Sequence, residues 1–265
     1  MYNYIKVPIA AGGRISAIWD GKVVSNAKWS VKDAAAGANH KVYRCLDAIN
    51  NVDFCVSVDD NQADYSLIQL WEDWDAGAHA GVGDTLSGVP HPAATYPIRA
   101  YASGGTHLCY NDHRVMWGTS IYYQMVYIGE LKRFDTTKDM PVLIANTGSS
   151  YYGALGYSYN TDSQVCMACL WDQNGVVGQD LRMYGYSSGY KTHLTCNGSW
   201  FFQETTVHDD TSPYLAMGYL DGVCSMGSSL YNYFVNGIAP QCGDARWLVL
   251  GGNYSTKYWA AMRLA

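Results

Sequence analysis

The sequence feature that most constrains the fold is a recurring alternation of apolar and polar residues, rich in β-branched and aromatic side chains. Gly, Asn and Asp interrupt it at intervals. Alternation of this kind is typical of strands with one buried face, and such interruptions are typical of turns. The expected strands, spaced by roughly 8–12 residues as in sandwiches and barrels, are Val42–Asp47, Phe54–Val58, Tyr65–Trp71, Arg114–Met116, Ile121–Leu131, Pro141–Ala145, Cys166–Trp171, Leu181–Tyr184, Ser199–Gln203, Tyr214–Tyr219, Trp247–Leu250 and Tyr258–Leu264.

This pattern predicts an all-β fold: antiparallel β-sandwich or barrel-like lobes with long loops and little helix. A short helical turn is expected only at Val31–Ala36, and a long loop at Asp75–Ala94. The chain is expected to form a single β-rich unit over residues 1–265, or two lobes of about 1–148 and 149–265, because Gly, Ser and Tyr gather near Asn146–Tyr152. Turns are expected at Asp172–Gly175, Asn197-Gly198, Asp221-Gly222 and Asn236-Gly237.

The composition excludes several classes of protein. Only 15% of the 265 residues are charged, against about 25% in an average soluble domain. The hydrophobic content of 48% excludes a disordered chain, and the net charge of −6 gives no basic surface for nucleic acid. The aromatic mass is mainly 23 Tyr and 9 Trp, rings that pack on one side and hydrogen-bond on the other.

The first eleven residues, Met1 to Ala11, lack the charged and apolar regions of a secretion signal. No segment reaches the ~18 apolar residues of a membrane span. The expectation is therefore folding in a cytoplasm, with no membrane span.

Eight cysteines are present, and the only close pair is Cys166 and Cys169. On a strand, residues three apart point to opposite faces, which argues against a shared metal ion. For Cys45, Cys55, Cys166 and Cys169 we expect buried thiols, with disulfides as the alternative.

No motif predicts catalysis, a metal or a cofactor. Trp71–Asp75 places three carboxylates among two indoles, as a glycoside hydrolase would need, but adjacent acids on a strand face opposite ways. A solvated strand end explains the segment equally well. Gly185–Gly189 fits the Gly-x-Ser-x-Gly pattern, yet its surroundings indicate a β-turn rather than a strand-to-helix elbow. The chain is therefore not expected to be an enzyme.

Tyrosines mixed with Ser, Gly and Asn are the clearest candidates for a functional surface. Tyr brings contact area at low entropic cost, and obligate interfaces are rich in aromatics and poor in charge. The alternative is that these rings only line the strand faces of a monomer. The candidate interface residues are Tyr151, Tyr152, Tyr184, Tyr186, Tyr231 and Tyr233.

Part of the chain resembles structural proteins of tailed bacteriophages. The segments that carry the resemblance are an Asn-Asp-His-Arg motif leading into a strand, an aromatic run through Tyr-Ile-Gly, and a strand led by Pro. An upstream strand pair and the C-terminal end are also similar. These segments are Asn111–Trp117, Tyr122–Asp135, Met140–Asn146, Asp53–Val58 with Tyr65–Trp71, and Tyr258–Ala265. The resemblance covers about Val42–Ser150 and, more weakly, the last twenty residues. The chain departs from it in its eight cysteines and in the His- and Gly-rich segment after Trp74.

The resemblance implies a β-rich virion subunit, made in the host cytoplasm and present in several copies in the tail or baseplate. Its partners would be other virion structural proteins and copies of itself. One alternative is a carbohydrate-binding module or glycoside hydrolase that uses Trp71, Trp74 and Glu72 or Asp73. Another is a virion protein that binds the host receptor.

Overall fold

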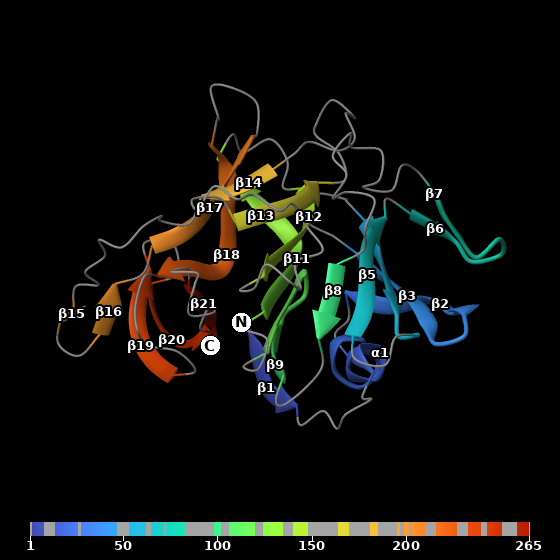
Figure 1. Cartoon of the computed structure of the whole chain (residues 1–265), viewed down its shortest axis with the longest axis horizontal. Coiled ribbons are helices and arrows are strands. Elements are labelled where there is room, and N and C mark those ends of the chain that lie inside the picture. The colour runs from blue at the N-terminus through green and yellow to red at the C-terminus, as the bar shows by residue number, and fades with distance from the viewer. Residues whose placement is uncertain are drawn as a thin grey trace.

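A computed structural model shows that the described part of the chain consists mostly of strands (Figure 1). The all-β class predicted from the alternation is confirmed. The structure describes residues 2–7, 14–25, 28–46, 53–61, 65–71, 73–82, 98–101, 106–119, 124–134, 140–147, 164–169, 181–184, 195–196, 199–201, 203–209, 216–226, 233–239, 243–250 and 259–264.

One sheet is antiparallel and has five strands in the order β2-β3-β4-β5-β8. A short hairpin of β6 and β7 lies between β5 and β8 in sequence and projects from the body of the molecule (Figure 1). The bounds are β2 Trp29–Gly37, β3 His40–Leu46, β4 Asp53–Asp59, β5 Tyr65–Trp71, β6 Asp73–Asp75, β7 Ala80–Val82 and β8 Ile98–Tyr101.

In the described part of the chain, a second sheet joins fourteen strands in the order β1-β9-β10-β11-β12-β13-β14-β17-β18-β21-β20-β19-β16-β15. Its pairings are antiparallel except that between β16 and β19. The bounds are β1 Asn3–Val7, β9 Thr106–Tyr110, β10 Arg114–Thr119, β11 Gln124–Arg133, β12 Met140–Thr147, β13 Gln164–Cys169, β14 Leu181–Tyr184, β15 Thr195–Cys196, β16 Ser199–Phe201, β17 Gln203–Asp209, β18 Ala216–Met226, β19 Tyr233–Ala239, β20 Gly243–Leu250 and β21 Trp259–Arg263.

The far end of β11 also pairs with β18, through Lys132↔Tyr219 and Arg133↔Gly218. The pairings β11-β12-β13-β14-β17-β18 therefore return to β11 and close a circuit of strands. Closure removes free edges, as in a barrel. The expected boundary near residue 148 falls inside this circuit, because β12 before it pairs directly with β13 after it.

The five-stranded sheet packs on β9, β10 and β11 to form a sandwich. A short helix α1 (Ile15–Ile18) and the π-helix η1 (Trp19–Val23) pack against its core. Trp19 is fully buried there, with its ring centroid 5.3 Å from that of Trp29, 4.9 Å from that of Tyr43 and 6.3 Å from that of Trp117. The buried apolar residues of this core are Ile15, Trp19, Val23, Trp29, Tyr43, Cys45, Phe54, Val56, Val58, Ile68, Leu70, Leu108, Tyr110, Val115, Trp117, Val126 and Ile128.

On its other side, the sheet formed by β1, β9, β10 and β11 contacts β18 through polar groups. Arg114, which is 5% exposed, lies with its guanidinium 3.3 Å from the Asp221 carboxylate and donates through Nε to the Tyr127 hydroxyl, 3.0 Å away. The Tyr2 hydroxyl donates to the Asp221 carbonyl at 2.8 Å. Gly222 has φ +81°, and a Cβ there would lie 2.8 Å from the Tyr2 hydroxyl oxygen, so this close contact requires glycine.

Several local expectations prove wrong. Val31–Ala36, expected to be helical, lies within strand β2, because pairing with β3 outweighs the helix preference of three alanines. Asp221-Gly222 and Asn236-Gly237, expected to be turns, lie inside β18 and β19. The segment Asp75–Ala94, expected to be a loop, contains strand β7. The turns expected at 172–175 and 197–198 lie outside the described residues.

Among the described residues, no helix has the length and apolar character that a membrane-spanning helix needs.

Candidate functional site

The two tryptophans of the Trp71–Asp75 segment pack on each other rather than facing solvent together. Their ring centroids lie 5.3 Å apart at an interplanar angle of 76°. Trp71 donates to the Ser57 hydroxyl at 2.9 Å, and Trp74, which is 4% exposed, donates to the Asp33 carboxylate at 2.9 Å. A sugar platform needs an exposed ring face, which Trp74 does not offer. The indoles hold the β6–β7 hairpin on the sheet, and Glu72 lies outside the described residues.

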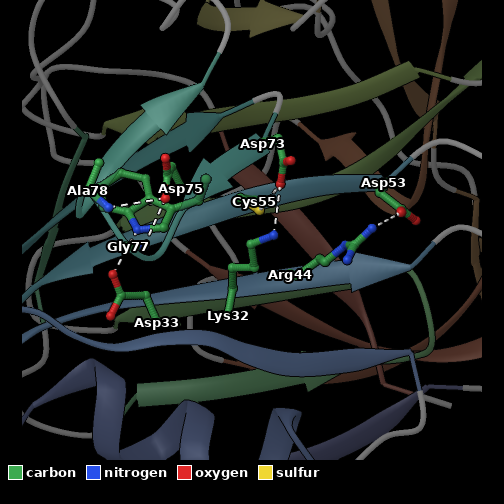
Figure 2. A network of polar contacts seen from close by, with 10 residues as sticks. Lys32, Asp33, Arg44, Asp53, Cys55, Asp73, Asp75, Gly77 and Ala78 are labelled. Atoms are coloured by element: carbon green, nitrogen blue, oxygen red, sulfur yellow. Dashed lines mark hydrogen bonds and ion pairs between the residues drawn. The ribbon is translucent and has the colours of Figure 1, made fainter.

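A polar network surrounds these indoles on the outer face of the five-stranded sheet (Figure 2). The Lys32 ammonium lies 3.2 Å from the Asp73 carboxylate, and the Cys55 thiol donates to that carboxylate over 3.8 Å. Arg44 on β3 and Asp53 at the start of β4 form a second ion pair. Burial works to raise the pKa of Asp73, but the Trp74 backbone N–H and Lys32 outweigh it and lower that pKa.

Asp33 is the buried centre of this network. One carboxylate oxygen accepts from the Ala35 backbone N–H at 2.9 Å, and the other contacts the Trp74 indole nitrogen and, at 2.7 Å, His79 Nδ1. His79 lies in the turn between β6 and β7 with φ +52°. Burial alone would raise the pKa of Asp33, but the bonds from His79, Trp74 and Ala35 lower it to about 2. The ionised carboxylate therefore fastens the hairpin to β2.

We expect Asp33→Asn to lower the free energy of unfolding at pH 7 by roughly 2 kcal/mol, since a lowered folded-state pKa means that the carboxylate stabilises the fold. This contribution is present above the ordinary Asp pKa and is lost as the pH falls from about 4 through about 2. Urea titrations at several pH values measure it. Asp53→Asn, at a half-exposed ion pair, is the matched control and should change little. An Asp33→Asn loss that persists undiminished below pH 2 would contradict the assignment.

A second cluster combines aromatic rings with an exposed arginine, and we call it the aromatic–arginine patch: Tyr4, His107, Phe234 and Arg246. The Tyr4 hydroxyl and His107 Nδ1 lie 2.9 Å apart, and these rings stack with centroids 6.1 Å apart. Phe234, which is 42% exposed, meets both rings edge-on at 6.1 and 6.2 Å. The Arg246 guanidinium lies 5.0 Å from the centre of the Phe234 ring.

The patch carries positive charge at its exposed side. Burial, together with the nearby Lys6, lowers the pKa of His107 to about 4, so its imidazole is neutral at pH 7. Burial raises the pKa of Tyr4. Lys6 and Arg246 are exposed, and no carboxylate whose side chain is described forms a salt bridge with either. An arginine over an exposed ring is a side-chain pairing that suits a protein interface.

The cysteines have only partly described surroundings. Cys45, Cys55 and Cys109 are buried and are not in disulfides. Burial, and secondarily the Asp73 charge, raise the pKa of Cys55 to about 12, which keeps the thiol protonated and unreactive. Cys166 and Cys169 both lie on β13, and their side chains are outside the described part of the structure.

Of the six tyrosines proposed as interface residues, two lie within the described part of the chain. Tyr184 ends β14 and Tyr233 begins β19, with only their backbones described. Tyr151, Tyr152, Tyr186 and Tyr231 lie outside the described residues. The sequence did not indicate the aromatic–arginine patch, because its members come from four strands, β1, β9, β19 and β20.

Within the described ranges, no group of three or more His, Cys, Asp or Glu side chains could hold a metal ion. No protein-family model matches the sequence, and no curated protein matches it.

Proposed function

We propose that the chain is a structural subunit of a tailed-phage virion, associated with the tail or baseplate, that acts through multivalent contacts with other virion proteins and copies of itself. The observation that carries the proposal is the aromatic–arginine patch. Phe234 is a large apolar side chain left exposed beside an arginine and a tyrosine. Aromatic residues and arginine are enriched at protein interfaces, and a low charged fraction suits them.

The arrangement of the strands supports the same proposal. The segments that resemble phage structural proteins include β10, β11 and β12, which pair in succession in the larger sheet. β10 and β11 belong to the sandwich, and β11 and β12 belong to the closed circuit. The resemblance therefore covers strands that the sandwich and the circuit share. An extended framework of paired strands suits a protein whose role is to hold neighbours in place.

The carbohydrate-binding alternative has less support, because it relies on Trp71 and Trp74. Both indole N–H groups bond within the chain, and the Trp74 ring is buried. The receptor-binding alternative predicts the same particle but a different partner, the surface of the host cell.

Two measurements test the proposal. Sedimentation velocity of the purified full chain over a range of concentrations, with electron microscopy of the same samples, should show a defined oligomer or an extended assembly. Mass spectrometry of purified particles of the encoding virus should find the chain at a fixed copy number. A chain that remains monomeric at every concentration, is missing from the particles and binds glycans would contradict the proposal.

A further inference from the structure

We infer that the aromatic–arginine patch of one copy binds the β6–β7 hairpin of a second copy, so that copies associate head to tail. The inference rests on the proposed function and deepens it by naming the two surfaces that meet. Three observations support it: the positive charge and exposure of the patch, the negative charge and exposure of the hairpin, and the position of these two surfaces on separate parts of the molecule.

The patch is built to accept a carboxylate beside a flat side chain. Phe234 offers an exposed ring, and the Arg246 guanidinium lies over it with donors left for a partner. Lys6, also exposed, adds a second positive charge near His107. A cationic and aromatic surface of this kind is complementary to an exposed carboxylate of a second copy.

The hairpin presents a carboxylate in a fixed geometry. Asp73 and Asp75 are exposed on either side of the buried Trp74, but the Asp73 carboxylate contacts Lys32 and Cys55 on the sheet, so Asp75 is the carboxylate offered to a partner. One oxygen of Asp75 accepts from the Gly77 and Ala78 backbone N–H groups at 2.8 and 3.1 Å, which orients the carboxylate. Its second oxygen makes neither of these bonds. The buried Asp33 and Trp74 anchor the hairpin, so binding would cost little conformational entropy.

The two surfaces lie on separate parts of the molecule. In Figure 1 the β6–β7 hairpin projects at the right, whereas β19 and β20 lie at the left, beyond β1 and β9. A contact between two different surfaces is heterologous, and it repeats from copy to copy until a ring closes or a filament extends. A hairpin and a patch on separate parts of the molecule therefore suit a subunit that is present in many copies.

Charge reversal with a mixing experiment tests the inference. Arg246→Glu blocks the patch and leaves the hairpin intact, while Asp75→Lys blocks the hairpin and leaves the patch intact. We expect each variant alone to associate at least about tenfold more weakly than the wild type in sedimentation velocity. An equimolar mixture should recover association, because it pairs an unchanged patch with an unchanged hairpin and a reversed patch with a reversed hairpin.

Two controls separate the contact from folding. Asp75→Asn keeps the oxygen that accepts in the turn and removes only the charge, so it should weaken association with unchanged circular dichroism. Phe134→Ala truncates an exposed ring elsewhere and should leave association as in the wild type. Variants that associate normally, or a mixture that recovers nothing, would overturn the head-to-tail contact and leave the proposed function standing. A wild-type chain that never associates would also overturn the head-to-tail contact, whereas the proposed function is overturned only if the chain is missing from the particles as well.

Discussion

Replacing Trp19 with alanine should lower the free energy of unfolding by about 3–5 kcal/mol, the range for removing a large buried aromatic side chain. Trp19 is fully buried and contacts rings from three strands, β2, β3 and β10, that belong to both layers of the sandwich. The cavity would therefore open where the two sheets and η1 meet. Urea unfolding followed by near-ultraviolet circular dichroism measures the loss.

Trp19→Phe is the matched variant for this test. The Trp19 indole nitrogen is buried with no hydrogen-bond partner among the described residues, so phenylalanine would remove ring area without breaking a bond. We expect Trp19→Phe to lower the free energy of unfolding by less than half as much as Trp19→Ala. A Trp19→Ala loss no larger than that of Phe134→Ala, at an exposed ring, would show that the sandwich core does not depend on Trp19.

Arg114→Ala should be the second most damaging change, with an expected loss of about 3 kcal/mol. The substitution leaves the buried Tyr127 hydroxyl without its Arg114 partner and removes the cation beside Asp221, and the partner left behind in a buried pair accounts for most of such a cost. It would also loosen the junction between β10 and β18. Chemical denaturation at pH 7 measures the effect.

A double-mutant cycle with Asp221→Asn isolates the pair. The sum of the two single losses in unfolding free energy should exceed the loss of the double variant, because each single change already breaks the same ion pair. Arg14→Ala, which removes an exposed arginine bonded to Asn39, is the control and should cost little. Additive losses for Arg114 and Asp221 would mean that the two side chains act independently.

The sequence allowed strands to be predicted where the alternation is regular. Tyr65–Trp71 and Leu181–Tyr184 match β5 and β14 in full, since apolar residues with regular polar neighbours and clear boundaries suffice there. Prediction failed where local preference and tertiary pairing disagree. The alanines of β2 favour helix, and Asn236-Gly237 favours a turn, yet pairing with β3 and β20 places both in strands.

The candidate sites were less predictable because they join residues far apart in the chain. Asp33 and His79 meet across 46 positions, and Tyr4 and His107 across 103. No periodicity within a segment reports which strands will lie side by side. The one site that sequence did suggest, Trp71 to Asp75, was located by its composition, but the inward orientation of Trp74 depends on the hairpin that β6 forms with β7.

The closed circuit of strands constrains the order in which the protein can fold during synthesis. The sandwich core needs only residues 15–128, so it can form while the rest of the chain is still in the ribosome. The circuit cannot close until β18 has emerged from the ribosome and pairs with β11. The hydrogen bond from Tyr2 to Asp221, 219 residues later in the chain, also forms only after β18 has been synthesised. Contacts of such long range form slowly. Until they form, β11 keeps an unpaired end, and the growing chain is most exposed to wrong partners during that interval.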